Sequence, residues 1–176
     1  ADLIDLPLQK WIASTGKPSI VSVGMATLGE IEDTVNLYRN IPNKNIILLH
    51  CVSNYPCEDD SLNLKVMNTL RQAFALPVGY SDHSVGTEAA VLSIAFGAKL
   101  VEKHFTLDKK LPGPDHQASS NPEEFTQLSQ AIRRAEKMIG SSVKMCQEEE
   151  QQMAQVSRKS IVLAKDVQEG EILTKN

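Results

Sequence analysis

The segments PVGYSDH (residues 77–83) and LVEKHFT (residues 100–106) decide the fold of this chain. Each begins with apolar residues and reaches a histidine, His83 in the first and His104 in the second. Apolar runs that end on a polar, ligand-type residue are typical of strands in a parallel α/β barrel, whose chemistry lies at the carboxyl ends of the strands. Because two neutral imidazoles on neighbouring strands can share one divalent metal, the pair predicts an enzyme site.

Strand-like and helix-like segments alternate around these two motifs. We expect strands over residues 19–23, 46–49, 77–80 and 100–105. We expect helices after the Thr27–Glu30 capping box, over about 61–74 and about 87–96, and from Asn121 to Gly140. Four consecutive βα units predict a parallel sheet with right-handed crossovers. An open doubly wound sheet is one fold that this order of elements allows. Residues 1–8 read as loop and helix with no strand before them, which favours the second half of a (β/α)8 TIM barrel.

The composition changes after Gly140. Residues 147–152 are all Glu or Gln, which predicts a solvated linker with some helix over 141–157. Residues 160–164, SIVLA, then predict a strand that opens a second domain over 158–176. The first domain is therefore expected to occupy residues 1–140.

Charge and cysteine content exclude several classes of protein. The net charge is −4 and 41% of residues are hydrophobic, a balance that argues against a nucleic-acid or anionic-membrane partner. No apolar run approaches the roughly 20 residues that span a bilayer, and no signal-peptide pattern opens the chain. The three cysteines lack CxxC spacing, so they suggest neither a disulfide framework nor a zinc site. A reducing cytoplasm is the simplest setting.

Five motifs, in order and spacing, resemble the sialic acid synthase family; they lie at residues 22–27, 50–56, 79–83, 102–106 and 112–116. The resemblance implies a transferase that condenses phosphoenolpyruvate with N-acetylmannosamine or a related amino sugar. The products would be a nine-carbon 2-keto sugar acid and phosphate. Family members carry a complete TIM barrel followed by a small β domain related to type III antifreeze proteins (SAF domain). This chain resembles the second barrel half, the linker and the beginning of that SAF domain, and the resemblance implies a homodimer.

The resemblance also assigns roles to individual residues. It implies that His83 and His104 are the metal ligands, with substrate oxygens and water completing the shell, a set that suits Mn²⁺ or Mg²⁺. Strand alternation places Glu102 on the same face as His104, where a carboxylate can orient an imidazole or handle protons. The remaining matched positions contact substrates in the family: phosphate for Ser22 and Ser81, phosphoenolpyruvate or sugar for Ser53 and Tyr55, and sugar hydroxyls for Asp115.

Alternatives remain for several of these residues. If His83 and His104 do not bind a metal, they form a hydrogen-bonded pair in the core. Asp82 belongs either to the site or to an outward ion pair. His50 is expected to be a polar residue inside the barrel. Two other functions compete. One is another metal-dependent phosphoenolpyruvate-condensing barrel, of the kind that makes 3-deoxy-heptulosonate phosphate. The other is a non-catalytic half-barrel that functions only by association. We expect the chain alone to be inactive, because a half-barrel exposes two sheet edges.

Overall fold

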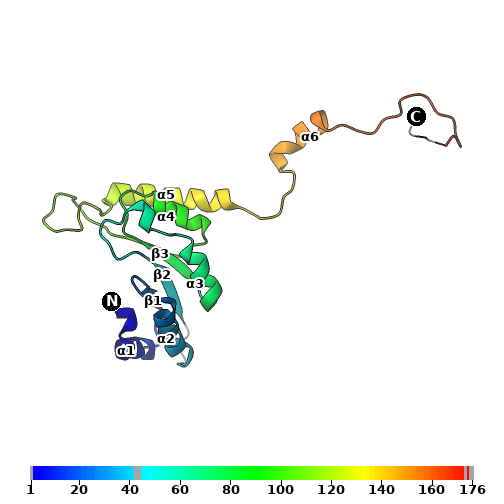
Figure 1. The fold of residues 1–176 in the computed structure, drawn as a ribbon. Helices are drawn as coiled ribbons and strands as arrows, with labels where there is room; N and C mark the ends of the chain where they lie inside the picture. Colours follow the sequence, from blue (N-terminus) through cyan, green and yellow to red (C-terminus); the bar gives the residue numbers. More distant parts are fainter. Residues whose placement is uncertain (1, 42–44, 173, 175–176) are drawn as a thin grey trace. The chain divides into compact units, whose positions relative to one another are not determined.

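The computed structural model describes residues 2–41, 45–172 and 174. The chain divides after Gly140 into two units, 1–140 and 141–176. In the first unit, four parallel strands form one sheet in the order β1-β2-β3-β4 (Figure 1). Their bounds are Ser19–Ser22 for β1, Ile46–His50 for β2, Val78–Asp82 for β3 and Val101–Lys103 for β4. The fold is the predicted α/β half-barrel of four βα units.

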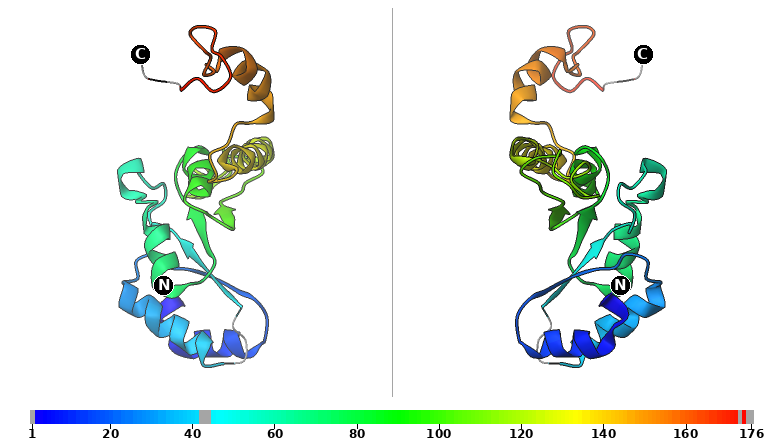
Figure 2. Two further views of the ribbon diagram at one scale, coloured as in Figure 1. Left: turned by 90° about the vertical axis from the view of Figure 1, so that its right-hand side faces the viewer. Right: turned by 90° about the vertical axis from the view of Figure 1, so that its left-hand side faces the viewer.

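Among the described residues of this unit, five α-helices accompany the sheet (Figure 2). They are α1 (Leu6–Ser14), α2 (Leu28–Arg39), α3 (Val66–Phe74), α4 (Glu88–Ala95) and α5 (Pro122–Ile139), with 3-10 turns η1 (Asp2–Ile4) and η2 (Asp59–Ser61). Thr27 and Asn121 each close a capping box at the start of α2 and α5, as the sequence predicts. The helix expected from about residue 61 begins only at Val66, because Asn63 adopts a positive φ of 46° that a right-handed helix does not accept.

The two faces of the sheet have different roles. Val21, Leu48, Val78 and Tyr80 face the helices and join one core with buried side chains of α2 and α3. Those helical residues are Ile31, Val35, Tyr38, Met67, Leu70 and Phe74. The alternate strand positions point the other way, toward the inside of the half-barrel.

His50 corrects one expectation. Its register partner is Tyr80, so its side chain lies on the helix-facing side of the sheet rather than inside the barrel. There its Nε2 bonds to the backbone carbonyl of Leu62 at 2.7 Å. The cause is the uniform apolar character of residues 46–49: a strand buried on both faces shows no alternation from which the inner face could be read.

The second unit contains a short helical segment followed by irregular chain. The 3-10 turn η3 (Glu148–Glu150) leads into α6 (Gln151–Ser157). The strand predicted over residues 160–164 is wrong, since the structure has no strand there and Ile161 is fully exposed. A strand needs a neighbour for its backbone N–H and C=O groups, and among the described residues of this unit none is paired. Positions 173, 175 and 176 of the predicted SAF segment lie outside the described residues.

The described helices include none that is both long and apolar enough to cross a membrane.

Candidate functional site

Two predicted site residues meet at the carboxyl ends of β3 and β4. Ser81 and Glu102 are register partners, and the Ser81 hydroxyl donates to Glu102 Oε1 at 2.7 Å. His83 and His104 follow these residues on the same two segments, with ring centroids 5.5 Å apart at an interplanar angle of 72°. The carboxylate, the hydroxyl and both imidazoles therefore form one cluster on the inner face of the half-barrel.

Tyr55 packs against both histidines from the loop that follows β2. Its ring centroid lies 4.1 Å from that of His83 and 5.2 Å from that of His104. The phenol is about half exposed, with 48% of its surface accessible. Partial burial raises the pKa of Tyr55, and the nearby acidic groups of Cys51, Asp115 and Glu102 raise it further. Tyr55 is thus neutral at physiological pH, and its hydroxyl can donate to a ligand.

The proton arrangement at His83 leaves one ring nitrogen available. Nδ1 lies 2.6 Å from the backbone carbonyl oxygen of Val52. Because a carbonyl can only accept, Nδ1 carries a proton, and in the neutral ring Nε2 then carries the lone pair. Nε2 lies 3.2 Å from Ser81 Oγ, whose single hydrogen is directed to Glu102 at the shorter distance of 2.7 Å. A backbone carbonyl that fixes the tautomer in this way is the usual support of a metal-binding histidine.

These residues fit a divalent cation bound by two protein nitrogens. Within the described ranges, neither ring nitrogen of His104 has a hydrogen-bond partner. The same described residues contain no group of three or more His, Cys, Asp or Glu side chains that could hold a metal ion. The pair therefore supplies two nitrogens, and water or substrate oxygens would have to complete the coordination. A mixed set of few imidazoles and many oxygens suits Mn²⁺ or Mg²⁺ better than a structural zinc ion.

A second group of small polar side chains lies where β1 and β2 end. Ser22 hydrogen-bonds to Cys51, and a Cβ placed on Gly24 would lie only 2.8 Å from Ser53 Oγ. Burial raises the pKa of the Cys51 thiol, and the charge of Glu102 adds to this. The thiol is therefore protonated at neutral pH and is a poor nucleophile. The Glu102 charge acts on the Cys51 thiol, so Cys51 lies within electrostatic range of that carboxylate.

Asp115 lies on the long loop between β4 and α5. Its carboxylate is exposed and contributes to the raised pKa of Tyr55, which puts the two side chains within electrostatic range of each other. The Asp115 backbone carbonyl accepts bonds from the backbone N–H and the hydroxyl of Ser119, which holds the loop in shape. The same loop is tied down by a 2.8 Å contact between His116 Nδ1 and Thr106 Oγ1.

Asp82 lies on the opposite face from this site. Its Oδ2 pairs with Lys103 Nζ at 2.8 Å, and neither side chain is more than 2% exposed. The open alternative for Asp82 thus resolves to an ion pair on the helix-facing side. Sequence reasoning missed Lys103 and the carbonyl of Val52. The alternation of strand residues could have identified Lys103, which is the register partner of Asp82, whereas no side-chain pattern reports a backbone carbonyl.

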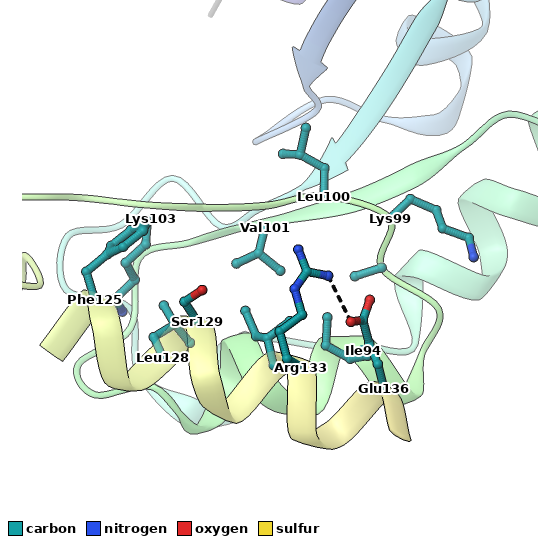
Figure 3. Close-up of a pocket in the computed structure, with 12 residues that line it drawn as sticks. Ile94, Lys99, Leu100, Val101, Lys103, Phe125, Leu128, Ser129, Arg133 and Glu136 are labelled. Atoms are coloured by element: carbon teal, nitrogen blue, oxygen red, sulfur yellow. Dashed lines mark hydrogen bonds and ion pairs between the residues drawn. The ribbon is translucent and has the colours of Figure 1, made fainter. Parts of the chain in front are cut away.

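A hollow of about 230 Å³ lies between α5 and β4 (Figure 3). Apolar side chains of Ile94, Val101 and Leu128 line it, and the exposed Arg133–Glu136 ion pair borders it. This hollow is on the helix-facing side of the last strand, away from Ser81 and Glu102. None of the predicted site residues lines it, so the histidine cluster remains the candidate active site.

A family model covers most of the chain. The model of the NeuB family matches residues 1–144, which include every residue of the cluster. The chain belongs to the NeuB family. It is 43% identical over 175 residues to the N,N'-diacetyllegionaminic acid synthase of Campylobacter jejuni, covering 98% of this chain and 52% of that enzyme. It is 33% identical over 174 residues to the N-acetylneuraminate-9-phosphate synthase of Homo sapiens, covering 98% of this chain and 48% of that enzyme.

Solved structures give the same family. The N-acetylneuraminic acid synthetase of Leptospira borgpetersenii superposes with a TM-score of 0.81 at 36% identity, over 88% of this chain and 54% of that one. A truncated 3-deoxy-D-arabino-heptulosonate 7-phosphate synthase of Thermotoga maritima superposes at 0.66 with 20% identity, over 81% of this chain and 58% of that one, a likeness of fold alone. This NeuB-family chain spans about half the length of the curated relatives it matches.

Proposed function

We propose that the protein carrying this chain condenses phosphoenolpyruvate with an N-acetylated amino sugar, releasing phosphate and a nine-carbon 2-keto sugar acid. One observation carries the proposal. Two imidazoles lie together beside the Ser81–Glu102 bond at the carboxyl ends of β3 and β4, with the Nε2 lone pair of His83 left available. Relatives named legionaminic, pseudaminic and N-acetylneuraminate-9-phosphate synthases support the same reaction class.

The reaction joins C3 of the enol phosphate to the aldehyde carbon of the sugar. Water then adds at C2, and the tetrahedral intermediate expels phosphate by C–O cleavage. His83 and His104 would hold Mn²⁺ or Mg²⁺, which when bound polarises the aldehyde oxygen. Ser22 presents a hydroxyl donor suited to the phosphate, and Ser81 presents one when its hydrogen turns from Glu102 to the phosphate. Glu102, already accepting from Ser81 at 2.7 Å, is placed to orient that hydroxyl and to accept a proton.

Three further residues would bind the sugar. Tyr55, Ser53 and Asp115 come from loops at the same end of the sheet, and a carboxylate suits sugar hydroxyls rather than a sugar phosphate. The Asp115 carboxylate therefore favours an unphosphorylated acceptor over the phosphorylated sugar of a heptulosonate-type synthase. The chain is 43% identical to two legionaminic acid synthases, against 33% to the human enzyme. A bacillosamine-derived sugar thus ranks with N-acetylmannosamine as the acceptor.

Assembly is part of the proposal. Ile20 and Ser22 lie exposed on the inner face of the half-barrel, and 52% of the Ile20 side chain is accessible. An exposed apolar side chain and the two open sheet edges need cover, so we expect the 176-residue chain alone to be inactive, and the active enzyme to be a homodimer of complete barrels. Free Cys51, Cys57 and Cys146 suit a reducing cytoplasm.

A chimeric enzyme tests the reaction. The first barrel half of the Campylobacter jejuni relative would be fused before this chain, and phosphate release from phosphoenolpyruvate would be followed with each amino sugar and Mn²⁺. We expect metal-dependent phosphate release. We also expect a product whose mass equals that of the amino sugar plus pyruvic acid. The unaltered Campylobacter enzyme is the control. A folded chimera that releases no phosphate with any acceptor would refute the proposal.

A further inference from the structure

Four buried polar residues on the far side of the sheet surround the backbone that carries His83. They are Tyr80, Asp82, Ser84 and Lys103, and the mechanism proposed above uses none of them. Figure 3 shows Lys103 on the side of β4 that faces α5, away from the inner face. Each charged member is the immediate sequence neighbour of a histidine: Asp82 precedes His83, and Lys103 precedes His104.

Lys103 joins the two histidine-bearing segments at two points. Its ammonium donates to Asp82 Oδ2 at 2.8 Å and to the backbone carbonyl of Ser84 at 2.5 Å. These acceptors come from the residues directly before and directly after His83. The other carboxylate oxygen of Asp82 accepts from the backbone N–H of Ser84 at 2.9 Å and from its hydroxyl at 2.7 Å. One ammonium thus holds both flanks of His83 to β4.

The backbone itself does not hold the histidines together. The register between β3 and β4 ends at the pair Asp82 and Lys103. Beyond it, the carbonyl of His83 accepts from the N–H of Cys57 at 2.9 Å, and the carbonyl of His104 accepts from Ser120 at 2.8 Å. The segments that carry the two imidazoles therefore turn to different partners where a fixed separation matters most. The ion pair is the last cross-link before that point.

We propose that Asp82 and Lys103 are positioning residues that fix the separation and orientation of the His83 and His104 rings. The inference rests on the proposed function, since it treats the two rings as a ligand pair. Buried ion pairs are seldom the most stabilising choice, because well-packed apolar side chains of similar volume often serve stability as well or better. The Lys103 side chain is 2% exposed and the Asp82 side chain 0%. The geometry that this buried pair imposes on the two histidine rings explains why it is there.

The test compares Asp82→Asn/Lys103→Met with the unaltered chain. This double variant removes both charges, so it leaves no unpaired buried charge to unfold the protein. Ser84→Ala is a milder second variant, since it removes one donor to Asp82 and keeps the ion pair. Arg133→Met is the matched control, because it breaks an exposed ion pair that lies within α5. Binding of Co²⁺, followed by its visible absorption, reports the imidazole pair without any need for turnover.

We expect the double variant to keep its unfolding midpoint and to bind Co²⁺ about 10-fold more weakly, the lower end of what loss of a supporting shell causes. Ser84→Ala should weaken binding less, and Arg133→Met should leave it unchanged. Equal affinity in the double variant would overturn the inference and leave the proposed function standing. Loss of Co²⁺ binding in His83→Ala is the required control for the site of binding.

If the unaltered chain binds no Co²⁺, that result counts against His83 and His104 as a metal-binding pair. A second measurement then still tests the positioning role. Nitrogen-15 NMR of the imidazoles reports the tautomer directly. The unaltered chain should show His83 with its proton on Nδ1, bonded to Val52. In the double variant we expect a mixture of tautomers, because the flanks of His83 are released. An unchanged single tautomer would overturn the positioning role whatever the metal result.

Discussion

Gly79 is the position at which the sheet tolerates no side chain. It lies on the inner face of β3, two residues before Ser81. A Cβ added there would meet the carbonyl oxygen of Leu100 at 2.5 Å and Cδ2 of Leu49 at 2.6 Å. The Leu49 side chain can rotate, but the Leu100 carbonyl is fixed because it accepts the 2.9 Å bond from the N–H of Tyr80. Gly79→Ala must therefore either break that bond or push β4 away from β3.

The size of the effect follows from these two contacts. Overpacking a fixed interior costs about 1–3 kcal/mol, and weakening the backbone bond contributes about 0.5–1.5 kcal/mol of such a loss. We expect Gly79→Ala to lower the free energy of unfolding by about 2 kcal/mol, which corresponds to a fall in Tm of about 4–8 °C for a domain of this size. Urea unfolding followed by far-ultraviolet circular dichroism measures this directly.

A matched glycine supplies the control. Gly29 lies within α2, and a Cβ there would meet nothing within 4 Å. Gly29→Ala should therefore stabilise the chain by about 0.5–1 kcal/mol, because alanine loses less backbone entropy in a helix. If Gly79→Ala were as stable as the unaltered chain while Gly29→Ala behaved as expected, the reasoning about the β3–β4 contact would be refuted.

Three further outcomes follow from the fold. Asn121→Ala removes the cap of α5 and should cost about 1 kcal/mol in urea unfolding; no loss would mean that the cap does not stabilise the helix. Burial lowers the pKa of His50, so the unfolded chain binds its proton more readily, and stability should fall as pH drops below the ordinary value of 6.5. His50→Gln should flatten that fall, and an unchanged profile would contradict the assignment. Thiol titration of the native chain should modify Cys146 quickly but spare buried Cys51 and Cys57, and rapid modification of all three would contradict the fold.

Local signals predicted much of this structure. The capping boxes at Thr27 and Asn121 and the four apolar runs locate the helices and strands because each depends on a few neighbouring residues. The late start of α3 depends on a positive φ at Asn63, which the apolar spacing of that segment does not report. The strand predicted over residues 160–164 is wrong because local signals do not report whether a partner strand is present. Its apolar and β-branched residues favour a strand, but a strand forms only where a partner meets its backbone.

The site divides in the same way. Strand ends and alternation point to the histidines and Glu102, and the family resemblance adds Ser81. The structure brings these four side chains together. The bond from His83 to Val52 could not be foreseen, because it joins a side chain to a distant backbone carbonyl. The face of His50 was hidden in an apolar strand that carries no alternation. The pairing of distant strands decides which face a side chain occupies and which backbone group it meets, and residue type alone does not report either.

The most direct test of the central claim is metal-dependent turnover in the chimera after His83→Ala or His104→Ala. If the two imidazoles hold the metal that activates the aldehyde, each single substitution should abolish phosphate release from phosphoenolpyruvate while the protein stays folded. Near-normal turnover in either variant would contradict the assignment of the His83–His104 pair as the metal-binding centre.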